Sequence, residues 1–183
     1  NAVDIICALD SVGVVTRVNK AFENRLGYSR QNVIDTSISD YLVKDDRAAF
    51  ENFLGLVRTE QQMSHHTEKD MLTIDGDTRH MEWSAKWDPE QQSYFCIIYD
   101  ITQRKELEQA KQQFVSMVSH DLRSPLTSIR VSLGMFLNGV FGDLGEKATS
   151  RLQTMDSSVD RLIRLINDLL DSEKLDAGQM DLL

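Results

Sequence analysis

The sequence predicts an α+β protein in which a five-stranded antiparallel sheet, with its helices on one side, precedes a long antiparallel helical hairpin. Short apolar runs separated by turn signals fill residues 1–100. From about residue 101 the apolar residues recur mostly three, four or seven positions apart, and Gly and Pro become rare. This change of period predicts two structural halves that meet near residue 100.

The chain is expected to begin with two short strands and a short helix. Residues 5–9 are a short apolar strand, residues 14–18 are a second strand, and a turn signal lies between them. Asn19 can cap the helix that follows, and Gly27 can end it, because glycine adopts the left-handed conformation common after a helix. These elements open the sheet half of the molecule.

A further helix is expected after two adjacent acids. The carboxylates of Asp45 and Asp46 suit the positive end of a helix dipole. The apolar residues that follow are expected to share one face: Ala49, Phe50, Phe53, Leu54 and Val57. This helix should therefore pack that face on the sheet.

Three more strands are expected before residue 100. Residues 67–74 and 78–87 flank an Asp-Gly pair at 75–76, which favours a hairpin turn. Residues 94–99 are apolar throughout and are expected to be buried on both faces. In the second of these strands, polar residues alternate with a face that should be buried: Met81, Trp83, Ala85 and Trp87.

The second half is expected to be two long helices joined by a glycine-rich loop over residues 139–145. If residues 101–138 are helical, the first helix is roughly 55 Å long at 1.5 Å per residue. Apolar residues of the second helix repeat alternately four and three apart, as in a heptad seam: Ala148, Leu152, Met155, Val159, Leu162, Ile166 and Leu169.

One hairpin cannot bury all of its apolar surface. Residues 162–170 carry leucine and isoleucine over more than one stripe of the helix. Two hairpins can bury this surface by forming a four-helix bundle. We therefore expect a twofold homodimer.

The composition excludes some classes of protein. With 183 residues, 41% hydrophobic and 27% charged, the chain should fold without a membrane span. A net charge of −9 argues against nucleic acid as the main partner. We expect a cytoplasmic location and leave open an anchor that precedes Asn1. Cys7 and Cys96 are expected to be buried free thiols, with a disulfide or redox switch as the alternative.

The chemistry-bearing stretch is residues 114–129. His120 lies two positions from each of Val118 and Leu122, roughly 200° around the helix, so it should face solvent. The carboxylate of Asp121 is adjacent and can take a proton from the imidazole. Taken alone, such a pair is more often a solvated helix surface than a catalytic site.

The residues after this pair add two features. Pro125 cannot donate to the carbonyl of Asp121, so the helix should bend here. Ser124 lies one turn beyond His120. An accessible imidazole, a carboxylate and a local kink together indicate a nucleophile site.

The flanking residues give a family resemblance. Ser-His-Asp-Leu-Arg-Ser-Pro-Leu, beginning at Ser119, resembles the H box of sensor histidine kinases, and the similarity extends over residues 105–178. The resemblance implies that His120 is the phosphoacceptor and Asp121 the general base. Arg123 would contact the phosphoryl group or be a solvated charge. Ser124 stands where many relatives have Thr or Asn for a phosphatase role, which is a departure.

The same resemblance implies the partners. They are a second copy of the chain, the receiver domain of a response regulator, whose aspartate takes the phosphoryl group, and an ATP-binding domain that would hold ATP and Mg²⁺. No motif of such an ATP-binding domain occurs within the sequence, so this chain alone is expected to be inactive. Nucleic acid is not among the expected partners.

The first half resembles a PAS sensor domain. The similarity rests on Asp10 with Gly13, on Asn19-x-Ala-Phe, on Asp75-Gly76 and on the exit motif Asp100-Ile-Thr. We therefore assign residues 1–100 to a PAS domain, 101–113 to a signalling helix and 114–183 to the dimerisation and phosphoacceptor domain. Asp100 and Arg104 are the residues expected to couple the two halves, although helix capping also explains Asp100.

The ligand of the sensor half is not evident. The helices between Asn19 and Val57 have no Cys of the kind that binds flavin photochemically, and the helix at 45–58 has no His for haem. His66 and His80 can approach each other across a hairpin, but surface histidines are the simpler interpretation. We expect no metal, and either no cofactor or a small apolar ligand.

Two alternative functions remain. The chain can be a PAS module that binds a ligand or partner and only dimerises, or an adaptor that has lost phosphorylation chemistry. Asp121 and Pro125 argue against the adaptor, because heptad packing needs neither residue. In the kinase interpretation, a change in the PAS half shifts or rotates the helix that begins near Ile101 and alters access to His120.

Overall fold

The computed structural model describes residues 4–60, 63–142 and 144–176. The chain forms two compact units, residues 1–106 and 107–183. The division falls within the segment 101–113 that the sequence assigns to a signalling helix. Each unit is described by itself.

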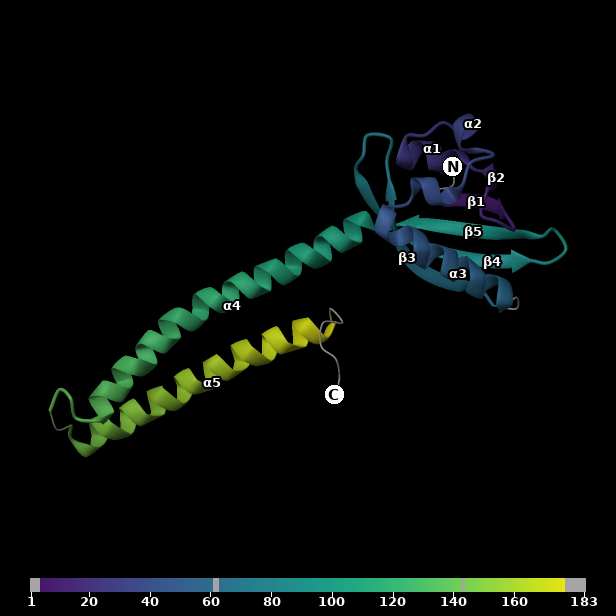
Figure 1. Cartoon of the computed structure of the whole chain (residues 1–183). Coiled ribbons are helices and arrows are strands. Elements are labelled where there is room, and N and C mark those ends of the chain that lie inside the picture. The colour runs from purple at the N-terminus through teal and green to yellow at the C-terminus, as the bar shows by residue number, and fades with distance from the viewer. Residues whose placement is uncertain (1–3, 61–62, 143, 177–183) are drawn as a thin grey trace. The chain divides into compact units, whose positions relative to one another are not determined.

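The first unit contains a five-stranded antiparallel sheet, as predicted (Figure 1). Its strands are β1 (Ile5–Asp10), β2 (Val15–Val18), β3 (His65–Leu72), β4 (Thr78–Asp88) and β5 (Ser93–Asp100). Their order is β2-β1-β5-β4-β3, so the first and last strands of the chain are neighbours at the centre of the sheet. Because β5 is central, the helix that leaves its end starts from the most extensively paired part of the sheet.

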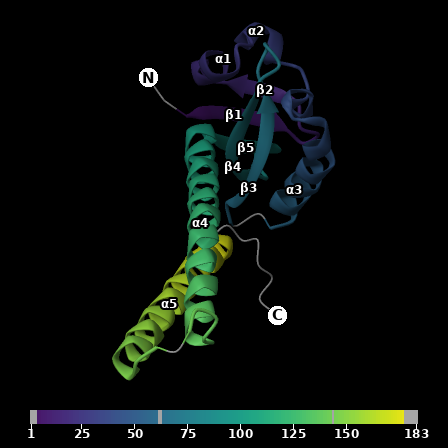
Figure 2. The ribbon, with the colours of Figure 1, turned by 90° about the vertical axis from the view of Figure 1, so that its left-hand side faces the viewer.

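Short helices cover one face of this sheet (Figures 1 and 2). They are α1 (Lys20–Leu26), α2 (Arg30–Val33), the 3-10 turns η1 (Ile38–Tyr41) and η2 (Lys44–Asp46), and α3 (Arg47–Thr59). The core lies between these helices and the inner face of the sheet. Its largest fully buried side chains include Trp83 of β4 and Phe50 of α3, whose rings pack edge-on with centroids 4.7 Å apart.

Gly27 ends α1 for the predicted reason and for a second one. Its φ of +83° lies in the left-handed region. In addition, a Cβ at this position would lie 2.5 Å from the Cγ2 of Ile74. The close approach lets the Ile74 amide donate to the Leu26 carbonyl, at 2.8 Å. The glycine therefore joins the end of α1 to the β3–β4 turn.

Three local predictions were wrong. Asn19 precedes α1, but its side chain donates to the Asp4 carbonyl and does not cap the helix. Ala49 is exposed, and the buried face of α3 consists of Phe50, Phe53, Leu54 and Val57. Residues 94–99 are buried on one face only, because the Phe95 side chain is 50% exposed. The helices cover one side of the sheet, so the other face of β5 has no layer against it.

The second unit is the predicted helical hairpin (Figure 1). Helix α4 (Thr102–Leu137) begins in the first unit and runs to the glycine-rich loop, and α5 (Glu146–Asp176) returns from it. Residues 177–183, the end of the predicted phosphoacceptor domain, lie outside the described residues. No helix in the described ranges is long and apolar enough to cross a bilayer.

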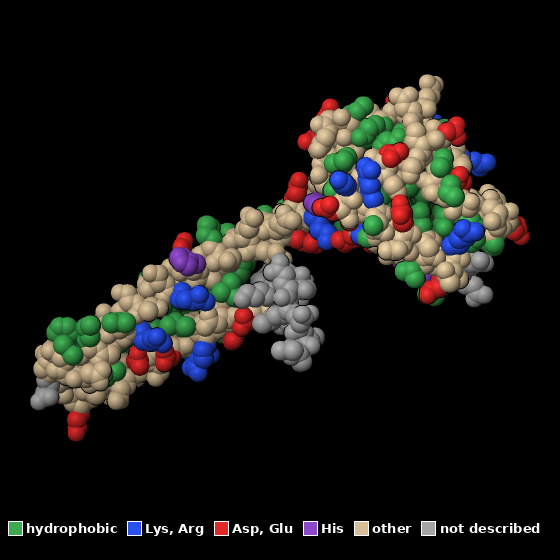
Figure 3. All heavy atoms as spheres, in the orientation of Figure 1, with side chains coloured by type: hydrophobic (Ala, Val, Ile, Leu, Met, Phe, Trp, Pro, Cys, Tyr) green, Lys and Arg blue, Asp and Glu red, His purple; other side chains and the backbone are tan. Residues whose placement is uncertain are grey.

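The apolar residues of the hairpin form two stripes. The inner stripe packs α4 on α5 and includes the buried Leu133 and Val159. The outer stripe is exposed in the single chain and repeats at heptad spacing, with Leu122, Ile129 and Phe136 on α4 and Met155, Leu162 and Leu169 on α5. Figure 3 shows hydrophobic side chains along the surface of this unit. The single seam predicted for α5 is therefore divided between the two stripes.

Candidate functional site

His120 lies on the surface of α4, as its spacing predicted. Its side chain is 82% exposed and that of Asp121 is 72% exposed. The preceding residue, Ser119, is almost fully buried, and Val118 is half-buried. The helix therefore turns His120 outward. Leu122, predicted to be buried, lies on the outer stripe and is 47% exposed in the single chain.

Asp121 contacts one of the two ring nitrogens of His120. The Nδ1 of His120 lies 3.2 Å from the Oδ1 of Asp121. Because a carboxylate only accepts, a neutral imidazole in this contact donates from Nδ1 and keeps the lone pair on Nε2. The exposed Nε2 is thus the nitrogen available to attack an electrophile.

The next turn of α4 contains the other predicted site residues. Arg123 reaches across to α5, where its Nη2 donates to the Oδ1 of Asn167 at 2.7 Å. Ser124 is exposed one turn beyond His120. Helix α4 is continuous through Pro125, and the bend expected there stays a prediction. Asn167 was not predicted to take part in the site, and it lies 47 positions after His120 on the other helix.

Asp100 joins three elements where β5 ends and α4 begins. Its Oδ1 accepts from the backbone N–H of Thr102 at 3.0 Å, which caps α4. Its Oδ2 lies 3.7 Å from the Nη1 of Arg25, at the end of α1. The hydroxyl of Thr102 in turn accepts from the backbone N–H of His80 on β4, at 3.0 Å. Neither Arg25 nor Thr102 was predicted to take part in this junction.

The first turn of α4 is also paired with the edge of the sheet. Arg104 lies 3.5 Å from Glu68 of β3 and 3.9 Å from Glu82 of β4. Lys105 adds a 2.6 Å contact with Glu68. These pairs are partly exposed, so each contributes little to stability, and together they join the first turn of α4 to β3 and β4.

The two histidines proposed to meet across the hairpin do not. His66 is opposite Ser84, while His80 is opposite Asp70 and contacts its carboxylate through Nδ1 at 2.7 Å. Within the described residues, no group of three or more His, Cys, Asp or Glu side chains is placed to hold a metal ion.

Cys7 and Cys96 are opposite each other on the neighbouring strands β1 and β5. Both are free and buried. A hydrogen bond with the Cys7 thiol, reinforced by burial, raises the pKa of Cys96 well above its usual value. The Cys96 thiol therefore stays protonated and is a poor nucleophile.

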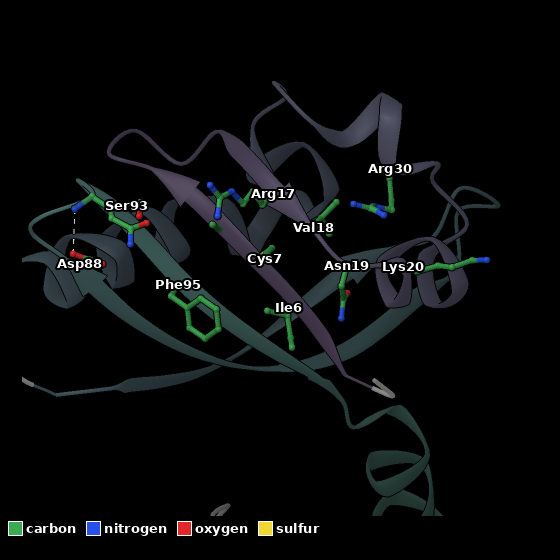
Figure 4. Close-up of a pocket in the computed structure, with 12 residues that line it drawn as sticks. Ile6, Cys7, Arg17, Val18, Asn19, Lys20, Arg30, Asp88, Ser93 and Phe95 are labelled. Carbon is green, nitrogen blue, oxygen red and sulfur yellow. Dashed lines mark hydrogen bonds between the residues drawn. The ribbon is translucent and has the colours of Figure 1, made fainter. Parts of the chain in front are cut away.

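The open side of the sheet carries a hollow of about 680 Å³ (Figure 4). Ile6 and Phe95 are among its apolar residues. Arg17 and Arg30 line it as well, and no ion pair joins either to a carboxylate in the part of the chain that the structure describes. The rim carboxylate of Asp88 instead accepts from the backbone of its own turn. The hollow thus combines an apolar surface with uncompensated positive charge.

Two protein families match the chain in the order of its two units. Residues 1–101 match the PAS fold. Residues 110–178 match the His Kinase A (phospho-acceptor) domain. His120 and its neighbours lie within the second match, and the Asp100 junction lies at the end of the first.

Curated relatives cover both units. The chain is 28% identical over 178 residues to "Sensor histidine kinase WalK" of Bacillus subtilis (strain 168), a match that covers 95% of this chain and 28% of that protein. It is 37% identical over 83 residues to "Sensor protein kinase WalK" of Staphylococcus saprophyticus, covering 45% of this chain and 13% of that protein. The chain thus spans less than a third of the length of these relatives.

Solved structures resemble the first unit. The RpfR quorum-sensing receptor PAS domain of Cronobacter turicensis, solved in complex with C12:0, has a TM-score of 0.50 at 22% identity, over 56% of this chain and 97% of that one. The PAS domain of an HTR-like protein from Haloarcula marismortui has a TM-score of 0.49 at 24% identity, over 55% and 84%. At these identities the likeness concerns the fold alone. With a PAS fold followed by a His Kinase A phosphoacceptor domain, the chain belongs to the sensor histidine kinases.

Proposed function

We propose that this chain is the signal-sensing and phosphoacceptor part of a sensor kinase, and that His120 accepts the phosphoryl group. The observation that carries the proposal is an exposed imidazole whose Nδ1 is held by Asp121 while Nε2 remains accessible. The donor is ATP with Mg²⁺ on an ATP-binding domain, which the matched ranges do not include. The acceptor that follows is an aspartate of a response regulator.

The geometry suits an in-line displacement. The Nε2 lone pair attacks the γ-phosphorus, the bond from phosphorus to the β,γ-bridging oxygen breaks, and ADP leaves. The Nδ1 proton passes to the carboxylate of Asp121, which acts as the general base. We also propose that the Ser124 hydroxyl, one turn beyond His120, orients a water molecule when a response regulator is dephosphorylated.

The test is phosphorylation in trans. The chain is incubated with radiolabelled ATP and the ATP-binding domain of the Bacillus subtilis relative. A label on the chain that is lost in acid and kept in base indicates phosphohistidine. No label under conditions in which that relative's own phosphoacceptor domain is labelled would refute the proposal.

We further propose that Asp100 transmits a change in the sensor to α4. Replacing Asp100 by alanine removes both the helix cap and the contact with Arg25. We expect a loss of about 1 kcal/mol in the free energy of unfolding, as is usual for a lost cap, and an altered rate of His120 phosphorylation. Chemical denaturation and the trans assay measure the two effects.

Asp10→Ala is the matched control for this prediction. The Asp10 carboxylate accepts from the backbone N–H groups of Val12 and Val14, but it lies at the end of β1 and outside the hollow. Its loss should lower stability similarly and leave the phosphorylation rate unchanged. Equal rates in the two variants would show that Asp100 is only a cap.

The hollow on the open side of the sheet favours a second function, the binding of a small organic anion. Arg17 and Arg30 can pair with a carboxylate or phosphate, and Phe95 offers a ring for the apolar part of the ligand. Such a ligand would touch β5, the strand that continues into α4. A PAS module that binds a ligand and has no catalytic role would also have such a hollow.

An anilinonaphthalene sulfonate dye is a suitable probe, because it combines an anion with an aromatic body. We expect saturable binding in a fluorescence titration and about tenfold weaker binding by Arg17→Glu, equivalent to about 1.4 kcal/mol. Lys44→Glu makes the same change in charge on an exposed residue outside the hollow. Equal affinities of these two variants would show that the dye binds elsewhere.

A further inference from the structure

Two of the polar contacts between α4 and α5 lie one heptad apart. Nη2 of Arg123 donates to the Oδ1 of Asn167 at 2.7 Å, and Nη1 of Arg130 lies 3.4 Å from the Oδ1 of Asp160. Arg130 follows Arg123 by seven residues, and Asp160 precedes Asn167 by seven. In antiparallel helices this spacing makes the second contact a repeat of the first.

The two contacts differ in the charge of the partner. Asp160 is a carboxylate and compensates the charge of Arg130. Asn167 is a neutral amide, and no carboxylate among the described side chains lies within ion-pair distance of Arg123. The guanidinium of Arg123 is therefore held in place without being neutralised. One N–H is used by Asn167, and the other donors of the guanidinium remain for another acceptor.

The uncompensated charge is on the turn that carries His120. Residues three apart on a helix lie on the same side of it, so Arg123 projects from the side of α4 that carries His120. A phosphoryl group on Nε2 would bring negative charge next to the carboxylate of Asp121, which repels it. A guanidinium held at this level offsets that repulsion and can bind phosphoryl oxygens in a bidentate manner.

We propose that Asn167 is a positioning residue that holds Arg123 beside His120 while leaving its positive charge available to the phosphoryl group. This inference rests on the proposed function, because it assumes that His120 is phosphorylated. An aspartate at position 167 would hold the same guanidinium but cancel its charge, as Asp160 does for Arg130. The choice of an amide at this position is therefore the feature to test.

The experiment compares Asn167→Asp with Asp160→Asn in the whole chain, using trans phosphorylation and the half-life of the phosphorylated product. We expect Asn167→Asp to fold normally and to be phosphorylated about tenfold more slowly, equivalent to about 1.4 kcal/mol of activation free energy. We expect Asp160→Asn to behave like the unsubstituted chain. Circular dichroism on heating checks the fold of each variant.

A second pair of variants tests whether Asn167 acts through Arg123. In an Arg123→Ala background, the change Asn167→Asp should have no further effect on the rate. A tenfold loss that persists in this background, or equal rates for Asn167→Asp and the unsubstituted chain, would overturn the inference while leaving His120 as the phosphoacceptor. Absence of label on the unsubstituted chain would instead refute the proposed function and this inference with it.

Discussion

Replacement of His120 by glutamine is expected to abolish acid-labile labelling of the chain. Glutamine keeps a polar side chain of similar reach but has no nitrogen lone pair that can attack phosphorus. The fold should be unaffected, because the His120 side chain is 82% exposed and contacts Asp121, which is itself on the surface. Surface changes of this kind usually alter stability by no more than about 0.5 kcal/mol. Scintillation counting after electrophoresis at alkaline pH measures the label.

His80→Gln is the matched control for this loss. His80 also contacts a neighbouring carboxylate through Nδ1, but it lies on β4 and is only about one-third exposed. We expect this variant to take up label as the unsubstituted chain does. Label that remains on His120→Gln, or that disappears equally from both variants, would contradict the assignment of His120.

The sequence predicted the parts of the fold that depend on local periodicity. Met81, Trp83, Ala85 and Trp87 alternate with polar residues, and all four are buried. The exposure of His120 agrees with its angular separation from Val118, although Leu122, the other neighbour used for this prediction, is exposed in the single chain. In both cases one residue's environment is determined by residues within a turn or two of it.

The errors arose where the environment is determined by distant residues. The residues of β5 are apolar on both faces, but no layer covers the face of Phe95. Asparagine often caps helices, yet the Asn19 side chain donates to the carbonyl of Asp4, which precedes β1. The Arg123–Asn167 contact depends on the register of α4 against α5. The conformation of the glycine-rich loop determines this register, and local sequence patterns do not specify that conformation.

The division of the hairpin into two stripes has the same cause. Heptad spacing shows that residues share a seam, but it does not distinguish packing within one chain from packing between chains. Leu162 and Val159 are three positions apart in one predicted seam, yet Val159 is buried against α4 and Leu162 is 48% exposed. A single chain therefore leaves the outer stripe without another helix to pack against.

A second copy of the chain is the partner that we propose for this stripe. The stripe occurs on both helices, and a twofold axis would bring α4 and α5 of one hairpin against the same residues of the other. Burial of each leucine contributes about 1.5–3 kcal/mol, so several heptads are enough for association at micromolar concentration. Light scattering should therefore give the mass of two chains.

The substitutions Leu162→Glu and Leu169→Glu together are expected to give a monomer that keeps the helices of the hairpin. Two carboxylates in each copy would face apolar side chains, and an unpaired charge in such an interface costs more than the contacts at the remaining heptads recover. Changes at Gln153 and Thr154 to glutamate, on exposed positions of α5 that are not apolar, add the same charge and should leave a dimer. A dimer in the leucine variant, or a monomer in the unsubstituted chain, would show that the outer stripe does not join two copies.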